Sequence, residues 1–71
     1  GLAPKIRQEL FAAIRSIHQS GIPVLLVEQE VGTVFQMADR NYVLSQGKII
    51  AEGSGKQLMA DETLRAGYLG M

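Results

Sequence analysis

The sequence predicts an α/β fold whose elements follow in the order helix, strand, helix, strand, strand, helix. Apolar residues recur at helical spacing near the N-terminus, a continuous apolar run follows a Gly and a Pro, and two strand-like runs are joined by a two-residue link. A chain of 71 residues forms at most one small domain. Such a chain buries only about 60% of the surface that its unfolded form exposes, so we expect a thin core.

The first helix is predicted from Pro4 to about Ser20. Pro suits the first turn of a helix because its missing N–H has no intrahelical partner there. Gly21 is placed to end the helix in a left-handed conformation, and Pro23 blocks its continuation. Between these limits the apolar positions lie on one helical face: Ile6, Leu10, Ile14 and Ile17.

Val24–Val27 is predicted to form a strand. It is a continuous β-favouring run without the polar alternation of a strand that shows one face to water, so we expect both of its faces to be covered. Glu28, Gln29 and Glu30 follow, and a second, short helix is indicated by Val31, Val34, Phe35 and Ala38. Gln29 is therefore expected at a strand-to-helix junction, and such carboxyl ends of strands bind ligands in open α/β sheets.

A β-hairpin is predicted over about 41–52. The runs 41–45 and 48–52 are joined by Gln46-Gly47, a two-residue link with Gly in a turn position. After Gly53-Ser54-Gly55, further apolar positions indicate one or two short terminal helices: Leu58, Met59, Leu64, Tyr68 and Leu69.

The composition excludes several classes of protein. Seven basic and seven acidic side chains balance and are interleaved, which argues against nucleic-acid binding. The chain has no Cys and one His, so neither disulfides nor a Cys/His metal site are expected. The longest apolar stretch, 22–27, is far short of the roughly 20 residues of a membrane helix. Gly1-Leu2-Ala3-Pro4 has no initiator Met and no signal-peptide features, which predicts a start inside a longer chain.

Two motifs have both a functional and a structural interpretation. Gly53-Ser54-Gly55-Lys56 resembles the end of a phosphate-binding loop, but Ile50 and Gln57 do not match that pattern, so we favour a turn before a helix. Glu28-Gln29-Glu30 could supply carboxylates for acid–base chemistry. Neighbouring strand residues point to opposite faces, however, so the residues alone favour solvated loop positions.

Three further polar residues are expected to have surface roles. His18 lies near the end of the first helix, where a partly charged imidazole meets the negative pole of the dipole. Asp39-Arg40 follow the second helix, where an ion pair or a backbone cap is the ordinary explanation.

The order and spacing of these features resemble the last third of the nucleotide-binding domain of ABC-transporter ATPases, which has a P-loop NTPase fold. The matching segments cover nearly the whole chain: 21–29, 38–40, 42–44, 47–50 and 52–53. Gly1-Leu2-Ala3-Pro4 resembles the tail of the D-loop, and together with 65–70 it is similar to the ATPases of branched-chain amino-acid importers. The resemblance implies that 1–71 is a single partial domain, the C-terminal part from the D-loop tail onward.

The resemblance also implies roles for particular residues. Gln29 would occupy the switch-His position, which senses the γ-phosphate. A Gln amide can donate a hydrogen bond to a phosphate oxygen or hold the attacking water, but it cannot titrate near neutral pH. Gly1 and Leu2 would lie in the D-loop tail, at the interface of the nucleotide dimer. The parent protein would use ATP and Mg²⁺. The chain alone lacks the Walker motifs, so it is expected to bind no cofactor and to be inactive.

The implied parent is the energy-coupling subunit of an importer, most simply for branched-chain amino acids. Its partners would be a second ATPase subunit and membrane permease subunits, and it would lie in the cytoplasm on the inner face of the cell membrane. Without the upstream part of the subunit, the chain is expected to self-associate through Val24–Val27. Two alternatives stay open: the same ATPase family with another cargo such as urea, or a free-standing α/β protein-interaction module in which Gln29 is only a loop residue.

Overall fold

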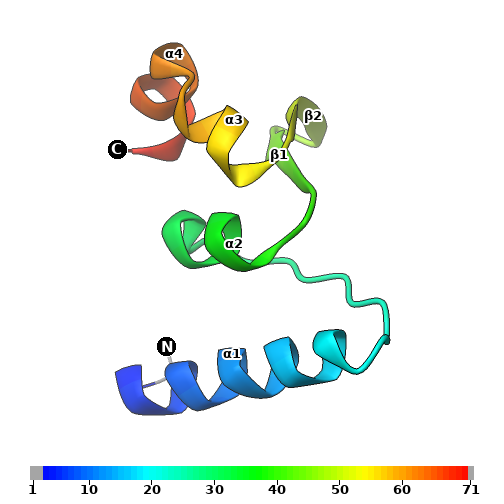
Figure 1. Ribbon diagram of the computed structural model, residues 1–71. Helices are drawn as coiled ribbons and strands as arrows, with labels where there is room; N and C mark the ends of the chain where they lie inside the picture. Colours follow the sequence, from blue (N-terminus) through cyan, green and yellow to red (C-terminus); the bar gives the residue numbers. More distant parts are fainter. Residues whose placement is uncertain (1–2, 71) are drawn as a thin grey trace.

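The computed structural model describes residues 3–70, and within them it contains helices and a two-stranded sheet (Figure 1). The elements, in chain order, are α1 (Pro4–Gln19), α2 (Val31–Met37), β1 (Asn41–Ser45), β2 (Lys48–Gly53), α3 (Gly55–Met59), α4 (Glu62–Leu64) and a π-helical turn, η1 (Arg65–Leu69). Helix α1 lies along one side of the molecule with α2 beside it, and the hairpin and the C-terminal helices lie beyond α2 (Figure 1).

Helix α1 confirms the first predicted helix at both ends. Pro4 is its first residue, and Gly21 follows its end with a φ of 98°, a backbone conformation that favours Gly. The Ser20 hydroxyl donates a hydrogen bond of 2.6 Å to the Ile17 carbonyl and so satisfies one of the last free carbonyls of the helix. Phe11 is the one buried residue of α1.

The predicted strand at Val24–Val27 is wrong. The segment is extended but is not part of a sheet, because a strand requires a hydrogen-bonded neighbour and the β1–β2 hairpin lies beyond α2. The observed order is therefore helix, helix, strand, strand and short helices. The expectation that both faces are covered also fails, since Leu25 and Val27 are each 90% exposed while Leu26 is half-buried.

The hairpin at 41–52 is confirmed. β1 pairs with β2 in antiparallel register, with Ser45 opposite Lys48. Gln46 and Gly47 have φ values of 52° and 77°, as expected for the two central residues of a type I′ turn. The register shifts between Val43 and Leu44, which marks a β-bulge.

A capping box starts α3 directly after the hairpin. The Ser54 side chain accepts a hydrogen bond from the backbone N–H of Gln57, and the Gln57 side chain accepts one from the N–H of Ser54. The interpretation of 53–56 as a turn before a helix is thereby confirmed. Asp61 caps α4 in a similar way, because its carboxylate accepts a hydrogen bond of 3.0 Å from the N–H of Leu64.

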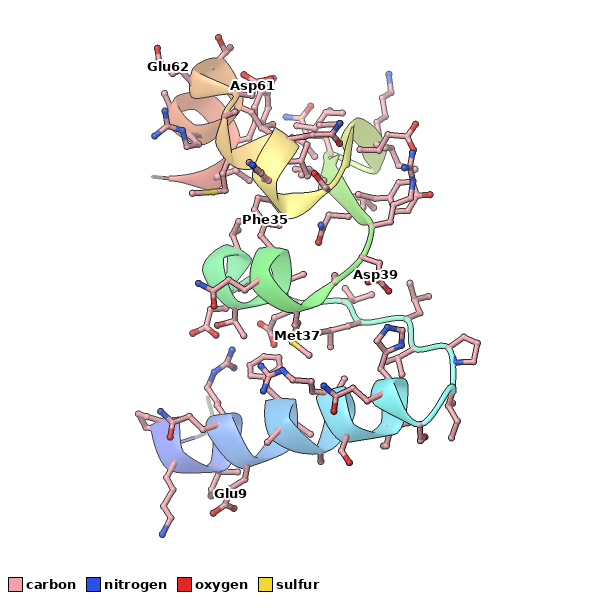
Figure 2. The ribbon with its side chains drawn as sticks, viewed as in Figure 1. Glu9, Phe35, Met37, Asp39, Asp61 and Glu62 are labelled. Carbon is pink, nitrogen blue, oxygen red and sulfur yellow. The ribbon has the colours of Figure 1, made fainter. Side chains whose placement is uncertain are left out.

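The core is thin, as expected. Within the described residues the buried apolar side chains are Phe11, Leu58 and Leu64. Two partly buried side chains of α2 link the layers, since Phe35 points toward α3 and Met37 toward α1 (Figure 2). The accessible surface is 5576 Å², whereas a compact monomer of 7.7 kDa has about 4300 Å². The radius of gyration of 12.9 Å likewise exceeds the roughly 11 Å of a compact chain of this length.

Candidate functional site

Gln29 lies in the loop between the extended segment and α2, shortly before the first helical residue, Val31. The helical half of the predicted strand-to-helix junction is confirmed, and the strand half is wrong. Gln29 is exposed, and its side-chain amide makes no hydrogen bond to any of residues 3–70. Its donor and its acceptor are therefore available to a ligand.

Glu28 folds its carboxylate back onto the backbone of this loop. Its Oε1 accepts hydrogen bonds from the backbone N–H of Gln29 at 2.8 Å and from that of Glu30 at 3.4 Å. The hydrogen bond from Gln29 is the main cause that lowers the pKa of Glu28 below its usual value, against an opposing effect of burial. The side chains of Glu28 and Gln29 are not hydrogen-bonded to each other within residues 3–70, and a Gln amide does not titrate, so the two do not form an acid–base pair.

Arg7, in the first turn of α1, connects this loop to the helix. Its Nη2 lies 3.5 Å from Glu28 Oε2 and 3.4 Å from Glu30 Oε2, and its guanidinium carbon lies 5.3 Å from the ring centroid of Phe11. The Thr33 hydroxyl donates a hydrogen bond of 2.6 Å to Glu30 Oε2. This hydrogen bond, followed by the contact with Arg7, lowers the pKa of Glu30. Arg7, Glu28, Glu30 and Thr33 are called the Arg7 cluster below.

Sequence reasoning identified the acidic residues of the Arg7 cluster but not Arg7 or Thr33. Glu30 and Thr33 are three residues apart at the start of α2, a spacing that places side chains on the same side of a helix, so this contact had a local signal. Arg7 lies on a different helix, and nothing in its local sequence indicates which carboxylates it meets.

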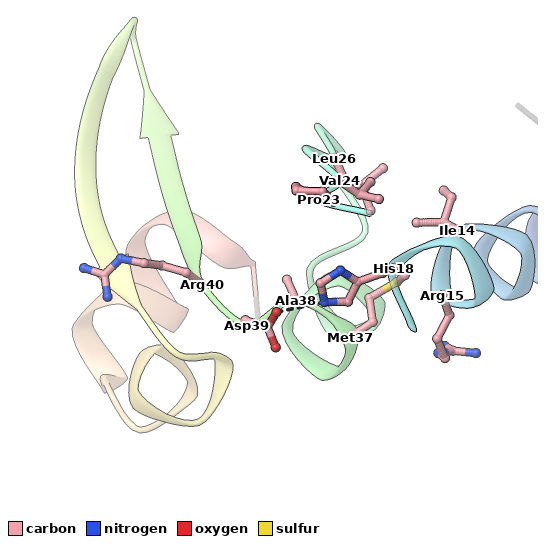
Figure 3. Close-up of a pocket in the computed structure, with 10 residues that line it drawn as sticks. All are labelled: Ile14, Arg15, His18, Pro23, Val24, Leu26, Met37, Ala38, Asp39 and Arg40. Carbon is pink, nitrogen blue, oxygen red and sulfur yellow. Dashed lines mark hydrogen bonds and ion pairs between the residues drawn. The ribbon is translucent and has the colours of Figure 1, made fainter. Parts of the chain in front are cut away.

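A pocket of about 300 Å³ lies between the second half of α1, the extended segment and the end of α2 (Figure 3). His18 and Asp39 meet at its edge, with Nε2 2.9 Å from Oδ2, and His18 Nδ1 lies 3.4 Å from the Ile22 carbonyl oxygen. Arg40 Nη2 donates a hydrogen bond of 2.7 Å to Glu52. Asp39 thus forms a hydrogen bond with His18 and Arg40 forms an ion pair with Glu52, which confirms their structural interpretation.

The remaining predicted site residues, Gly1 and Leu2, lie outside the described residues. Among residues 3–70, no group of three His, Cys, Asp or Glu side chains is arranged to hold a metal ion. None of the helices within the same range is long and apolar enough to cross a membrane.

Comparison with curated proteins shows that this sequence is similar to part of several transporter ATP-binding proteins. It is 40% identical over 70 residues to the high-affinity branched-chain amino acid transport ATP-binding protein BraG of Pseudomonas aeruginosa, a match that spans 99% of this chain and 30% of BraG. It is 41% identical over 64 residues to the energy-coupling factor transporter ATP-binding protein EcfA2 of Streptococcus pyogenes, which spans 90% of this chain and 23% of EcfA2. No protein-family model matches the sequence.

The chain therefore spans less than a third of the length of these relatives. Within that span the match includes Gln29 and the elements on both sides of it, because it covers nearly every residue of this chain. This sequence therefore resembles a C-terminal fragment of an ABC-transporter ATP-binding subunit, similar to the ATPases of branched-chain amino-acid importers.

Proposed function

We propose that this chain is one part, a single partial domain, of the ATP-hydrolysing subunit that couples energy to an ABC importer of branched-chain amino acids. The observation that carries the proposal is the 40% identity to BraG over 99% of the chain. The similarity to EcfA2 supports the energy-coupling role without favouring a cargo. Urea or another solute remains the alternative cargo, because the solute is selected by other subunits of such a transporter.

Gln29 is the residue of this chain that would act on the nucleotide. Its exposed amide can donate a hydrogen bond to a phosphate oxygen or orient the attacking water, and the hydrogen bond from its N–H to Glu28 holds its backbone. Phosphoryl transfer depends on positioning and on electrostatic stabilisation, so such a contact acts on the transition state. Gln29 is thus a positioning group for the γ-phosphate, and Gly1 and Leu2 belong to the D-loop tail at the dimer interface.

The side chains of this region fit one edge of an ATP site rather than a whole site. Bound MgATP would supply the phosphoryl group and the charge neutralisation of the metal. The described residues offer Gln29 to a phosphate but no cluster of metal ligands, so the metal would be held by other parts of the subunit. A second ATPase subunit and membrane permeases are the proposed partners, and they place the protein on the cytoplasmic face of the membrane.

The test is Gln29→Ala in a complete subunit that carries this sequence. Turnover is expected to fall about tenfold to a hundredfold, as for the loss of one hydrogen-bond donor to a developing charge, while nucleotide affinity changes less. Steady-state ATP hydrolysis and nucleotide titration measure the two effects. Gln36→Ala, an exposed Gln on α2, is the matched control and should leave both unchanged. Unchanged turnover in Gln29→Ala would make Gln29 an ordinary loop residue.

The isolated chain is proposed to neither bind nor hydrolyse ATP, since it has none of the metal ligands or phosphate-binding loop of a complete site. Calorimetric titration of the 71-residue chain with MgATP checks this point. Saturable binding in the micromolar range would contradict it.

A free-standing interaction module is the second candidate, and the exposure of Leu25 and Val27 is the observation in its favour. The coding sequence upstream of Gly1 separates the two candidates. A Walker B run that ends in Asp-Glu just before Gly1 supports the ATPase subunit, whereas a stop codon or an unrelated domain supports the module.

A further inference from the structure

Gln29 is placed between two carboxylates, which is an unfavourable setting for a phosphate contact. Glu28 precedes it and Glu30 follows it, and both side chains have pKa values below the usual range, so both are charged at neutral pH. Like charges repel over several Å even at the surface of a protein. A phosphate that approaches Gln29 therefore needs a nearby positive charge that offsets these two.

Arg7 is the cation that meets both carboxylates. Its Nη2 lies within 3.5 Å of Glu28 and 3.4 Å of Glu30, and its side chain is only 27% exposed. The buried Phe11, one turn further along α1, holds the guanidinium from another side by a cation–π contact. The charge of Arg7 is therefore fixed in place, unlike that of a solvated surface Arg.

The contacts of the two carboxylates connect Arg7 to the backbone on both sides of Gln29. Glu28 uses Oε2 for Arg7 and Oε1 for the Gln29 N–H, so one carboxylate joins α1 to the Gln29 backbone. Glu30 Oε2 meets both Arg7 and the Thr33 hydroxyl, which joins α1 to the first turn of α2. Loss of Arg7 would release both connections and would leave two uncompensated negative charges beside Gln29.

We propose that Arg7 is a positioning residue for Gln29: it anchors the Gln29 loop to α1 and offsets the charges of Glu28 and Glu30, so that a phosphate can approach the Gln29 amide. The inference rests on the proposed role of Gln29 at a γ-phosphate. Arg7 itself does not touch the nucleotide in this proposal. It acts through the geometry and the charge of the Arg7 cluster.

The experiment compares Arg7→Gln with Lys5→Gln in the complete subunit. Both variants remove one positive charge from the first turn of α1, but Lys5 is exposed and forms no ion pair within residues 3–70. Arg7→Gln is expected to raise the KM for ATP about five- to tenfold, the effect of one unit charge at about 4 Å in the dielectric of water, and to lower kcat. Lys5→Gln is expected to change neither.

Two further readouts separate positioning by charge from simple structural support. The KM defect of Arg7→Gln should shrink as ionic strength rises, because salt screens the repulsion from the carboxylates. Adding Glu30→Gln to Arg7→Gln should lower the raised KM part of the way toward the value of the parent subunit, since it removes one of the two charges that Arg7 offsets. A variant that is merely misfolded would respond to neither change, and thermal unfolding of each variant identifies that case. Arg7→Lys, which keeps the charge but not the planar guanidinium that packs on Phe11, should recover only part of the affinity lost in Arg7→Gln.

The outcomes distinguish this proposal from the proposed function. If Gln29→Ala lowers turnover while Arg7→Gln behaves like Lys5→Gln, the role of Arg7 is wrong and the ATPase function stands. If Arg7→Gln has a defect that neither salt nor Glu30→Gln reduces, Arg7 is a structural residue and the proposal is again wrong. If Gln29→Ala is without effect, the proposed role of Gln29 fails and the inference about Arg7 fails with it.

Discussion

Gly55 packs so closely against Phe35 that a Cβ at Gly55 would overlap the backbone oxygen of Phe35. This contact brings the start of α3 against α2, and Gly55 is buried there. It therefore ties the hairpin and the C-terminal helices to α2, the helix that follows the Gln29 loop. The absence of a side chain at Gly55 is a requirement of the packing rather than of the backbone angles, since its φ is not in the left-handed region.

We expect Gly55→Ala to lower the free energy of unfolding by about 1–3 kcal/mol, because α3 must move away from α2 to make room for the methyl group. Urea unfolding of the chain measures the change. Gly32→Ala is the matched control, since Gly32 lies inside α2 with open space around its Cβ position. That substitution should stabilise the protein by about 0.5–1 kcal/mol, because Ala is the better helix former. Equal effects of the two substitutions would contradict the close contact.

Acid should weaken the attachment of the Gln29 loop to α1. The pKa values of Glu28 and Glu30 are lowered from a usual value of 4.5, so folding favours their charged forms. This contribution to stability is fully present above the unfolded-state pKa and is lost as the pH falls through the lower, folded-state values. Urea unfolding at a series of pH values should therefore show that the free energy of unfolding declines as the pH falls below about 5. This decline should be smaller in the double variant Glu28→Gln/Glu30→Gln than in the parent sequence. The same decline in both proteins would show that other carboxylates cause it.

Gln29→His is expected to give the complete subunit a new pH dependence. An imidazole can hold the phosphate contact that is proposed for the Gln29 amide, but it titrates near pH 6.5, whereas the amide does not titrate. Turnover of the variant should therefore remain substantial and should change between about pH 6 and pH 7.5, a range in which the turnover of the parent subunit is expected to be constant. Measured pH–rate profiles of the two proteins decide the point. Superimposable profiles would mean that residue 29 does not contact the reacting phosphate.

The features that the sequence predicted correctly are local ones. The ends of α1 follow from Pro4 and Gly21, and the hairpin follows from Gln46-Gly47, because each signal acts on the backbone within a few residues. The strand predicted at 24–27 is wrong because strand formation depends on a non-local partner. A run of β-favouring residues becomes a strand only beside another strand, and no second edge lies next to this segment within residues 3–70.

In the candidate site, too, local features could be predicted and contacts between distant elements could not. The position of Gln29 before a helix was predictable from the residues that flank it. Two contacts to α1 could not be predicted in this way. Arg7 attaches the Gln29 loop through carboxylates of another element, and His18 attaches the end of α2 through Asp39, which is 21 positions away in the sequence. Side chains of opposite charge are common in the sequence, and only the fold selects which of them meet.

The extended segment makes self-association the expected behaviour of the isolated chain. Leu25 and Val27 are each 90% exposed, the backbone of the segment has no strand partner within residues 3–70, and the accessible surface exceeds that of a compact monomer. Pairing with a second copy would satisfy the unpaired backbone and would bury apolar area worth about 25 cal/mol per Å².

Leu25→Lys should shift the isolated chain from dimer or larger assembly to monomer without unfolding it, because Leu25 contacts little within its own chain. Leu26→Lys is the informative contrast, since Leu26 is half-buried in the pocket between α1 and α2 and a Lys there would lose both the apolar packing of Leu26 and part of its own hydration. That variant should unfold as well as dissociate. Light scattering behind a sizing column measures the assembly, and circular dichroism measures the folding. A well-folded monomer of the unmodified chain at high micromolar concentration would contradict the prediction, because the exposed face would then be stable in water without a partner.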